Sequence, residues 1–250
     1  MTDPADFYTG LVVEAYSALK AQTFDPAPYA AFVREHGQPG LEVGCGAGQP
    51  LLQLAEEGLD VDGVDSSPDM IEQARTAARQ HGLHVGLHVA RMEEMDLDRQ
   101  YRSIYLAGPT FQLLPDDEAA SRALEAFRRH LAPGGTLMVP LWVAGPTPAE
   151  QLGAAREAVG DSGAVLRYTP VSEDYDPVTR TRRTAVTYER IPATGPRERV
   201  DREWVIHWQT RHTIAELASK AGLTVRDVEP PGAAGEDEVG EEFTAFLTHA

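Results

Sequence analysis

Short apolar runs alternate with amphipathic stretches of helical period through the first part of the chain. The apolar runs lie at residues 41–44, 61–64, 84–90, 104–107 and 137–143. Strands that alternate with helices are typical of a parallel sheet covered by helices, so we expect an α/β fold here. Ser67-Pro68 predicts the start of one helix, because serine caps free amides and proline suits the first helical position. The pattern over residues 116–131 predicts a second helix.

The C-terminal part of the chain has a different pattern. Two alternating runs, at about 178–191 and 198–208, predict antiparallel strands that form a flap on the main sheet. In the second run the even positions from Val200 to Trp208 share one face and His207 lies on the other. Capping boxes at 147–150 and 213–216 predict further helices. Two short apolar runs, 223–228 and 243–247, predict closing strands, the last one antiparallel at the sheet edge.

Composition restricts the classes of protein further. The 250 residues fit one domain, and a net charge of -17 with a pI near 4.8 argues against nucleic acid or an anionic membrane as partner. Cys45 is the single cysteine, which excludes an internal disulfide and a cysteine-based zinc site, and we expect no metal. The chain has no basic and apolar leader and no apolar run of about 20 residues. We therefore expect a cytoplasmic protein, either a monomer or a homodimer.

The sharpest chemical signal is the segment Leu41-Glu42-Val43-Gly44-Cys45-Gly46-Ala47-Gly48 at the end of the first expected strand. Glycines at alternate positions allow a tight turn and let a ligand approach the backbone. The following helix presents free amides to a polar ligand. Glu42, two residues before the first glycine, is placed to help hold an ammonium group. The Gly-x-Gly-x-Gly spacing differs from the dinucleotide fingerprint Gly-x-Gly-x-x-Gly.

A second signal is Asp65 at the end of the second expected strand, about twenty residues after the glycines. A carboxylate there can accept hydrogen bonds from both ribose hydroxyls of an adenosine. The alternative is that Asp65 caps the next helix, although Ser66 and Ser67 already serve that role. Met70, one turn further on, is placed either to cover an adenine face or to pack in the core.

Three segments together resemble class I S-adenosylmethionine-dependent methyltransferases. They are residues 42–48, residues 64–70 (VDSSPDM) and residues 131–137 (LAPGGTL), which look like motif I, the acidic loop and the post-helix turn of that family. The resemblance implies a Rossmann-like seven-stranded, mostly parallel sheet of order 3-2-1-4-5-7-6 with helices on both faces. It implies S-adenosylmethionine as cofactor and S-adenosylhomocysteine as product. We expect a single domain over 1–250, with a helical lid at 1–38, a cofactor-binding core at 39–145 and the β flap at 160–210.

The resemblance also assigns cofactor contacts position by position. Gly44, Cys45 and Gly46 would line the methionine moiety, Asp65 and Ser66 the ribose, and Met92 and Glu93 the adenine edge, while the Ala107 carbonyl would lie near the methionine ammonium. The family often has Asp where this chain has Arg91. The carboxylate contact to the adenine amine would then come from Glu93 or be replaced by backbone groups.

The layout around Tyr16 and the flap is similar to that of small-molecule methyltransferases, including the sugar N,N-dimethyltransferases of antibiotic pathways. That likeness implies that Tyr16 lies on a helix that closes over the cofactor. It also implies methyl transfer to a nitrogen or an oxygen of a small-molecule acceptor in secondary metabolism. The sequence leaves the choice between nitrogen and oxygen open.

The acceptor site is expected beyond the C-terminal ends of strands four and five. Residues 108–112, which include Phe111, would lie at its floor together with Trp142, and Trp204, Trp208 or His207 would cover it from the flap. The tryptophans have the alternative role of core or flap packing. His207 and His212 are candidate general bases, because histidine titrates most readily near neutral pH. Their alternative is a half-exposed position on the surface.

Two other functions stay open at this point. A nicotinamide-dependent oxidoreductase would use a similar sheet, although the glycine spacing argues against it. A non-catalytic cofactor-binding regulatory protein would keep the fold without turnover. DNA is disfavoured as substrate, because Gly108-Pro109-Thr110-Phe111 stands where nucleic-acid amino-methyltransferases have Asn/Asp-Pro-Pro-aromatic.

Overall fold

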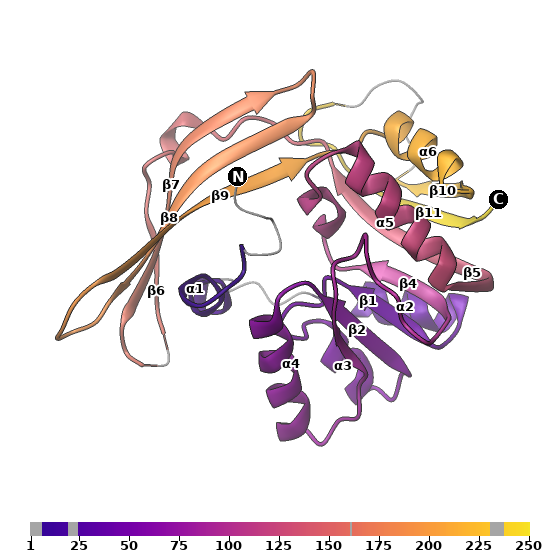
Figure 1. The fold of residues 1–250 in the computed structure, drawn as a ribbon, viewed down its shortest axis with the longest axis horizontal. Coiled ribbons are helices and arrows are strands. Elements are labelled where there is room, and N and C mark those ends of the chain that lie inside the picture. Colours follow the sequence, from indigo (N-terminus) through magenta and orange to yellow (C-terminus); the bar gives the residue numbers. More distant parts are fainter. Residues whose placement is uncertain (1–6, 20–24, 161, 231–237) are drawn as a thin grey trace.

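The computed structural model describes residues 7–19, 25–160, 162–230 and 238–250. Residues 1–6 and 20–24, which belong to the expected N-terminal lid, lie outside the described residues. The described chain forms a seven-stranded sheet and a four-stranded sheet, and helix α1 (Leu11–Leu19) lies beside the smaller one (Figure 1).

The seven-stranded sheet has the order β10-β11-β5-β4-β1-β2-β3. Its strands are β1 Gly40–Val43, β2 Val61–Asp65, β3 Leu87–Val89, β4 Tyr101–Leu106, β5 Leu131–Trp142, β10 Leu223–Glu229 and β11 Glu242–His249. β11 is antiparallel to both of its neighbours, and the remaining pairs of this sheet are parallel. Numbered within this sheet alone, the order is 3-2-1-4-5-7-6, so the predicted topology is confirmed.

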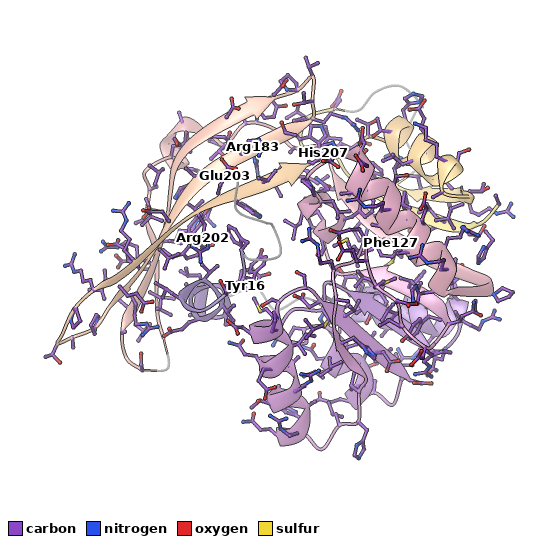
Figure 2. The ribbon with its side chains drawn as sticks, viewed as in Figure 1. Tyr16, Phe127, Arg183, Arg202, Glu203 and His207 are labelled. Atoms are coloured by element: carbon purple, nitrogen blue, oxygen red, sulfur yellow. The ribbon has the colours of Figure 1, made fainter. Side chains whose placement is uncertain are left out.

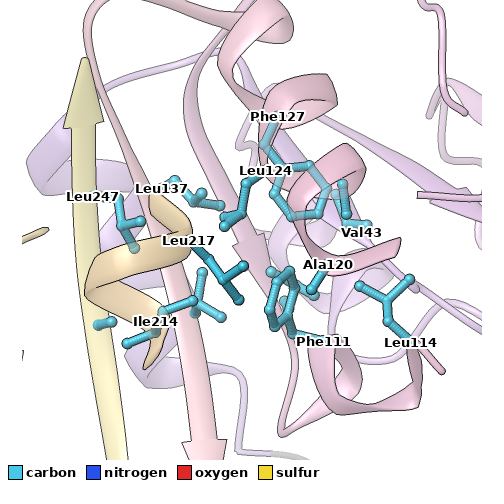
Figure 3. Packing of buried hydrophobic residues seen from close by; sticks show 14 of the residues in the cluster. Val43, Phe111, Leu114, Ala120, Leu124, Phe127, Leu137, Ile214, Leu217 and Leu247 are labelled. Carbon is cyan, nitrogen blue, oxygen red and sulfur yellow. The ribbon is translucent and has the colours of Figure 1, made fainter. Parts of the chain in front are cut away.

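Helices cover both faces of this sheet. They are α2 Ala27–His36, α3 Leu51–Glu56, α4 Pro68–Gln80, α5 Asp117–His130 and α6 Arg211–Lys220. Along β4 the side chains alternate between the two faces. Ile104 packs in the cluster that contains Phe127 of α5 and Leu217 of α6 (Figure 3), while Tyr105 packs in the cluster formed with α2 and α3. No helix in the described ranges is both long enough and apolar enough to cross a membrane.

The four-stranded sheet is the antiparallel flap that the sequence predicts. Its strands are β6 Arg156–Val159, β7 Val165–Asp176, β8 Thr181–Ile191 and β9 Glu198–His207, and they pair in chain order. The alternating runs predicted β8 and β9, whereas β6 and β7 were not predicted as strands. One end of the flap packs on α1 through Leu11, Val12, Val186 and Tyr188.

The two capping-box predictions need correction. The helix expected at 147–150 is only a short 3-10 turn, Ala149–Gln151, because the amide and hydroxyl of Thr147 both donate to Glu173 instead of capping. The helix expected from Thr213 begins three residues earlier. Thr210 is its N-cap, and Thr213 occupies the third helical position of a box in which each hydroxyl accepts the other residue's amide.

Candidate functional site

Two neighbouring pockets open at the C-terminal ends of β1, β2 and β4. The strand pocket, with a volume of about 80 Å³, is lined by Tyr8, Val43, Gly44, Val64, Asp65, Ser66, Ala90, Arg91, Met92, Glu93, Thr110, Leu113, Leu114 and Pro115. The central pocket, of about 430 Å³, is lined by Tyr8, Tyr16, Ser17, Gly44, Cys45, Gly46, Ala47, Gln49, Ala107, Pro109, Thr110, Leu113, Trp142, Trp204 and Ile206. The residues common to both, among them Gly44 and Tyr8, make the two pockets parts of one cleft.

The glycine loop requires glycine on geometric grounds. Gly44 has φ +74°, and a Cβ there would lie 2.4 Å from Cγ2 of Thr110. Its amide donates to the Val64 carbonyl at 2.7 Å, and the Cys45 amide donates to the same oxygen. The Cys45 thiol packs in the apolar cluster beneath the loop, where burial raises its pKa. Cys45 therefore presents its backbone, and not a thiolate, to the central pocket.

Asp65 holds this loop against the next helix. One carboxylate oxygen accepts from the Gly46 amide and the other from the Ser67 amide, each at 2.8 Å. Burial raises the pKa of Asp65, although the two amide hydrogen bonds oppose the shift. Each carboxylate oxygen can accept more than one hydrogen bond, so Asp65 keeps capacity for a ligand hydroxyl in the strand pocket.

The predicted adenine edge is built around an ion pair. Nε of Arg91 lies 2.8 Å from Oε1 of Glu93, whose side chain is 5% exposed. Both residues and Met92 line the strand pocket. Arg91 thus orients the carboxylate of a residue two positions later.

Trp142 is held at the mouth of the central pocket by a buried glutamine. Its amide donates to Oε1 of Gln112 at 2.6 Å, and its carbonyl accepts from Nε2 of the same side chain at 2.9 Å. Gln112 is fully buried, so these bonds fix the end of β5 much as a neighbouring strand would.

The other residues predicted to contact the cofactor differ in how deeply they are buried. Glu42 is fully buried beneath the loop, where its Oε2 accepts from the Tyr105 hydroxyl at 3.1 Å. Ala107 lines the central pocket, and its carbonyl accepts from the Thr110 hydroxyl at 2.9 Å. Tyr16 lines the same pocket from α1 (Figure 2). Met70 is 2% exposed and lies outside the lining of both pockets, which agrees with its alternative role in the core.

Two of the residues predicted at the acceptor site lie in the core instead. Phe111 is 1% exposed and packs against Phe127 (Figure 3), because the 3-10 turn at Thr110–Leu113 points it under the sheet edge. Trp208 is 3% exposed and stacks on Tyr175, with ring centroids 5.3 Å apart. Trp142 and Trp204 do line the central pocket.

Neither histidine lines the two pockets. His207 is buried at the junction of β9 and α5 (Figure 2), with Nε2 3.4 Å from Oδ1 of Asp117, and burial lowers its pKa. His212 is exposed on α6 and lies 3.4 Å from Glu216. The base role predicted for them stays a prediction that this placement does not favour. Within the described ranges, no three His, Cys, Asp or Glu side chains gather as metal ligands.

Sequence reasoning missed Tyr8, which lines both pockets. The ring of Tyr8 lies edge-on to Tyr16, and its carbonyl accepts from the Ser67 hydroxyl at 2.5 Å. No local pattern distinguishes Tyr8, because its place depends on contacts 59 residues away. Thr110, within the 108–112 segment expected at the pocket floor, lines both pockets too.

Comparison with known proteins adds sequence and fold relatives. A family model described as a methyltransferase domain matches residues 41–135. A dTDP-3-amino-3,6-dideoxy-alpha-D-glucopyranose N,N-dimethyltransferase from Streptomyces fradiae is 29% identical over 147 residues, or 56% of each chain. The chain thus matches little more than half the length of such relatives.

Solved structures match over nearly the whole chain. The CcbJ methyltransferase from Streptomyces caelestis superimposes with a TM-score of 0.75 at 21% identity, covering 100% of both chains. The S-adenosylmethionine-bound amino pentose methyltransferase CalS10 from Micromonospora echinaspora gives a TM-score of 0.66 at 21% identity, covering 96% of this chain and 98% of that one. At these identities the likeness establishes a shared fold.

Proposed function

We propose that this chain, whose residues 41–135 match the model of a methyltransferase domain and whose fold is that of solved methyltransferases, transfers a methyl group from S-adenosylmethionine to an amine of a small-molecule acceptor. The observation that carries the proposal is the junction of the strand pocket and the central pocket at Gly44. There a compartment whose wall carries the carboxylates of Asp65 and Glu93 meets a compartment lined by the aromatic rings of Tyr16, Trp142 and Trp204.

The residues of the strand pocket fit an adenosyl group. Asp65 offers carboxylate oxygens to ribose hydroxyls, and Glu93, held by Arg91, offers one to the adenine amine. Gly44 lines both pockets, and the methionine chain would pass from the strand pocket along this turn toward Ala107. S-adenosylmethionine supplies an electrophilic methyl group on its sulfonium sulfur.

The central pocket favours an amine over a hydroxyl as nucleophile. Among the described residues that line it, none carries a carboxylate or an imidazole. Its ionisable phenols do not replace them, because burial, reinforced by Asp65, raises the pKa of Tyr16 to about 12, and burial raises that of Tyr8. An amine needs only to be neutral to attack, whereas a hydroxyl gains from a general base. The N,N-dimethyltransferase relatives support the same choice.

In this proposal the protein accelerates the reaction by aligning the acceptor amine with the methyl group of the cofactor. In-line displacement is accelerated by holding the nucleophile and the methyl carbon in line. Trp142 and Trp204 would provide apolar walls for the acceptor, and Tyr8 and Tyr16 would close the pocket from the N-terminal side. The expected dependence of rate on pH then follows the pKa of the acceptor amine, with the rate rising as that amine loses its proton.

Calorimetric titration with S-adenosylmethionine, S-adenosylhomocysteine and NAD tests the cofactor assignment. We expect micromolar binding of the first two and none of NAD; binding of NAD alone would favour an oxidoreductase. A panel of amino sugars and matched hydroxyl sugars then tests the acceptor. Methylation of the amines only is expected, while methylation of the hydroxyl sugars would overturn the choice of nucleophile. Cofactor binding without any product across the panel would favour a regulatory protein.

We propose that 1–38 acts as a lid, 39–145 as the cofactor core and 160–210 as the flap of one domain. We also propose a cytoplasmic location, which agrees with the buried free thiol of Cys45, and a monomer or homodimer in solution. Cell fractionation and light scattering test these two points.

A further inference from the structure

A third cavity lies under the flap and is called the flap pocket here. It has a volume of about 350 Å³ and is lined by Trp142, Gly145, Pro146, Thr147, Pro148, Gln151, Arg156, Tyr168, Pro170, Arg182, Thr184, Trp204, Val239 and Gly240. Trp142 and Trp204 also line the central pocket, so the two cavities share these walls. A molecule whose amine lies in the central pocket therefore has a second compartment within reach.

Arg182 is the unusual residue of the flap pocket. It is 8% exposed, and its guanidinium carbon lies 4.9 Å from the centre of the Trp142 ring. Nη1 donates to the Gly145 carbonyl at 3.0 Å, whereas Nε is enclosed without a hydrogen-bond partner among the described residues. Burying a guanidinium is unfavourable unless its donors find acceptors. Burial accordingly lowers the pKa of Arg182.

Glu173 holds Arg182 in place but does not satisfy it. Its Oε2 lies 3.7 Å from Nε of Arg182, which is too long for a hydrogen bond. The carboxylate already accepts from the Thr147 amide at 2.7 Å, from the Thr147 hydroxyl and from Thr184 at 3.2 Å. Glu173 is also absent from the pocket lining. Nη2 of Arg182 makes no hydrogen bond among the described residues, so the guanidinium, which lines the pocket, keeps a donor for a ligand.

The other polar groups of the lining point to the same ligand chemistry. Arg156 makes no ion pair among the described residues, and its guanidinium carbon lies 5.7 Å from the centre of the Tyr168 ring. The Tyr168 hydroxyl has no described hydrogen-bond partner. The charged side chains of this lining are thus two arginines, in a protein whose net charge is -17. The protein as a whole repels anions. The two arginines make this pocket a local exception, which can attract an anion.

We propose that the flap pocket binds an oxyanion of the acceptor, a carboxylate or a phosphate remote from the methylated amine, and that Arg182 and Tyr168 donate hydrogen bonds to it. The inference rests on the proposed function, since it takes the central pocket as the site of methyl transfer. Arg182 then determines which acceptors are used, and it takes no part in the chemical step.

The test titrates the full chain, saturated with S-adenosylhomocysteine, with two probes at constant ionic strength: inorganic pyrophosphate and malonate. We expect at least one probe to bind. Arg182→Gln should weaken that binding about tenfold or more, as loss of a charge-assisted hydrogen bond does. Binding of pyrophosphate alone would indicate a phosphorylated acceptor, and binding of malonate alone a carboxylated one.

Two further variants keep the test decisive. Tyr168→Phe removes only a hydroxyl and should lower the affinity for the probe severalfold. This variant tests the inference even if Arg182→Gln folds poorly. Arg183→Gln is the matched control, because the next residue along β8 faces the other side and lies 3.4 Å from Glu203 (Figure 2). Failure of both probes to bind, or equal weakening by Arg183→Gln, would overturn the inference. Failure of S-adenosylhomocysteine itself to bind would instead overturn the proposed function.

Discussion

Asp65, at the end of β2, holds the glycine loop and is also the proposed ribose ligand. Its carboxylate accepts hydrogen bonds from the amides of Gly46 and Ser67, yet burial raises its pKa. A raised pKa means that the folded protein disfavours the ionised carboxylate. Ionised Asp65 therefore lowers the stability of the fold, which supports the proposal that it serves binding.

The first prediction concerns Asp65→Asn. We expect affinity for S-adenosylhomocysteine to fall about tenfold or more, because an amide is a weaker acceptor for ribose hydroxyls than a carboxylate. The melting temperature should fall as well, because one of the two backbone amides that Asp65 accepts would then face the NH2 group of asparagine, which cannot accept a hydrogen bond. Calorimetry and thermal unfolding measure the two quantities, and a large loss of stability with unchanged affinity would contradict the assignment.

The second prediction follows from the pKa of the same residue. Because Asp65 takes up its proton at a higher pH than an ordinary aspartate, affinity for S-adenosylhomocysteine should fall as the pH is lowered through weakly acidic values. Titrations across that range with wild type and Asp65→Asn provide the measurement. An equal pH dependence in the two proteins would assign it to another group.

The third prediction tests the close approach at Gly44. Gly44→Ala should lower both stability and cofactor affinity, since its Cβ would lie 2.4 Å from Cγ2 of Thr110 at a positive φ. Thr110→Ser removes that methyl group and keeps the hydroxyl bonded to Ala107. The double variant should recover part of the loss, and recovery of none would mean that backbone strain alone is responsible.

At the scale of elements, α5 and the flap are joined by a polar cluster around Asp117. This side chain accepts from Arg180 at 2.5 Å and from Gln209 at 3.1 Å, and it lies 3.4 Å from His207. Burial lowers the pKa of His207 below its usual 6.5. The unfolded chain therefore binds the proton first as the pH falls.

The fourth prediction follows from this sign. The stabilisation from neutral His207 is present above about pH 6.5 and is lost progressively as the pH falls toward the lowered folded-state pKa. His207→Gln should show a smaller loss of melting temperature between pH 8 and pH 5.5 than wild type, and methyl transfer should persist. His212→Gln, at an exposed position, is the control and should retain the wild-type dependence. Loss of turnover in a well-folded His207→Gln would restore that residue as a candidate base.

The fifth prediction concerns the support of Trp142. Gln112→Met leaves a buried amide and a buried carbonyl without partners, at roughly 1–3 kcal/mol for each group. For a chain of this size we expect the melting temperature to fall by about 4 °C or more. Gln100→Met, at an exposed site, should change it little, and equal effects of the two would argue against the pairing.

Predictability from sequence differed between the elements. The turn at Gly44 and the carboxylate of Asp65 depend on local chemistry, and both residues line the strand pocket; their contacts with a cofactor stay a prediction. The resemblance supplied the sheet order, which no local pattern contains. Alternation marked β8 and β9, but it cannot tell that Trp204 faces a pocket while Trp208 packs on Tyr175, because that depends on strand twist and on the partner surface. Phe111 and Tyr8 were misjudged or missed for the same reason, since their environments come from distant segments.

At the scale of the whole molecule, α1 bridges the two sheets. Its apolar side packs on the flap through Leu11 and Val12. Toward α4, the Gly10 amide donates to Asp69 at 2.9 Å and the Ser17 hydroxyl to Gln73 at 3.2 Å. Tyr8 and Tyr16, before and within this helix, line the central pocket. One wall of the cleft is thus formed by a segment, Tyr8 and α1, that contacts both the flap and α4 of the main sheet.

This bridge constrains how segments can be exchanged between proteins of this fold. A designer who grafts the flap of a relative onto this core, hoping to inherit a new acceptor, would leave Val186 and Tyr188 of the old interface without their matched helix. The N-terminal helix and the flap should therefore be exchanged as one unit, and lineages that change acceptor should vary the two together.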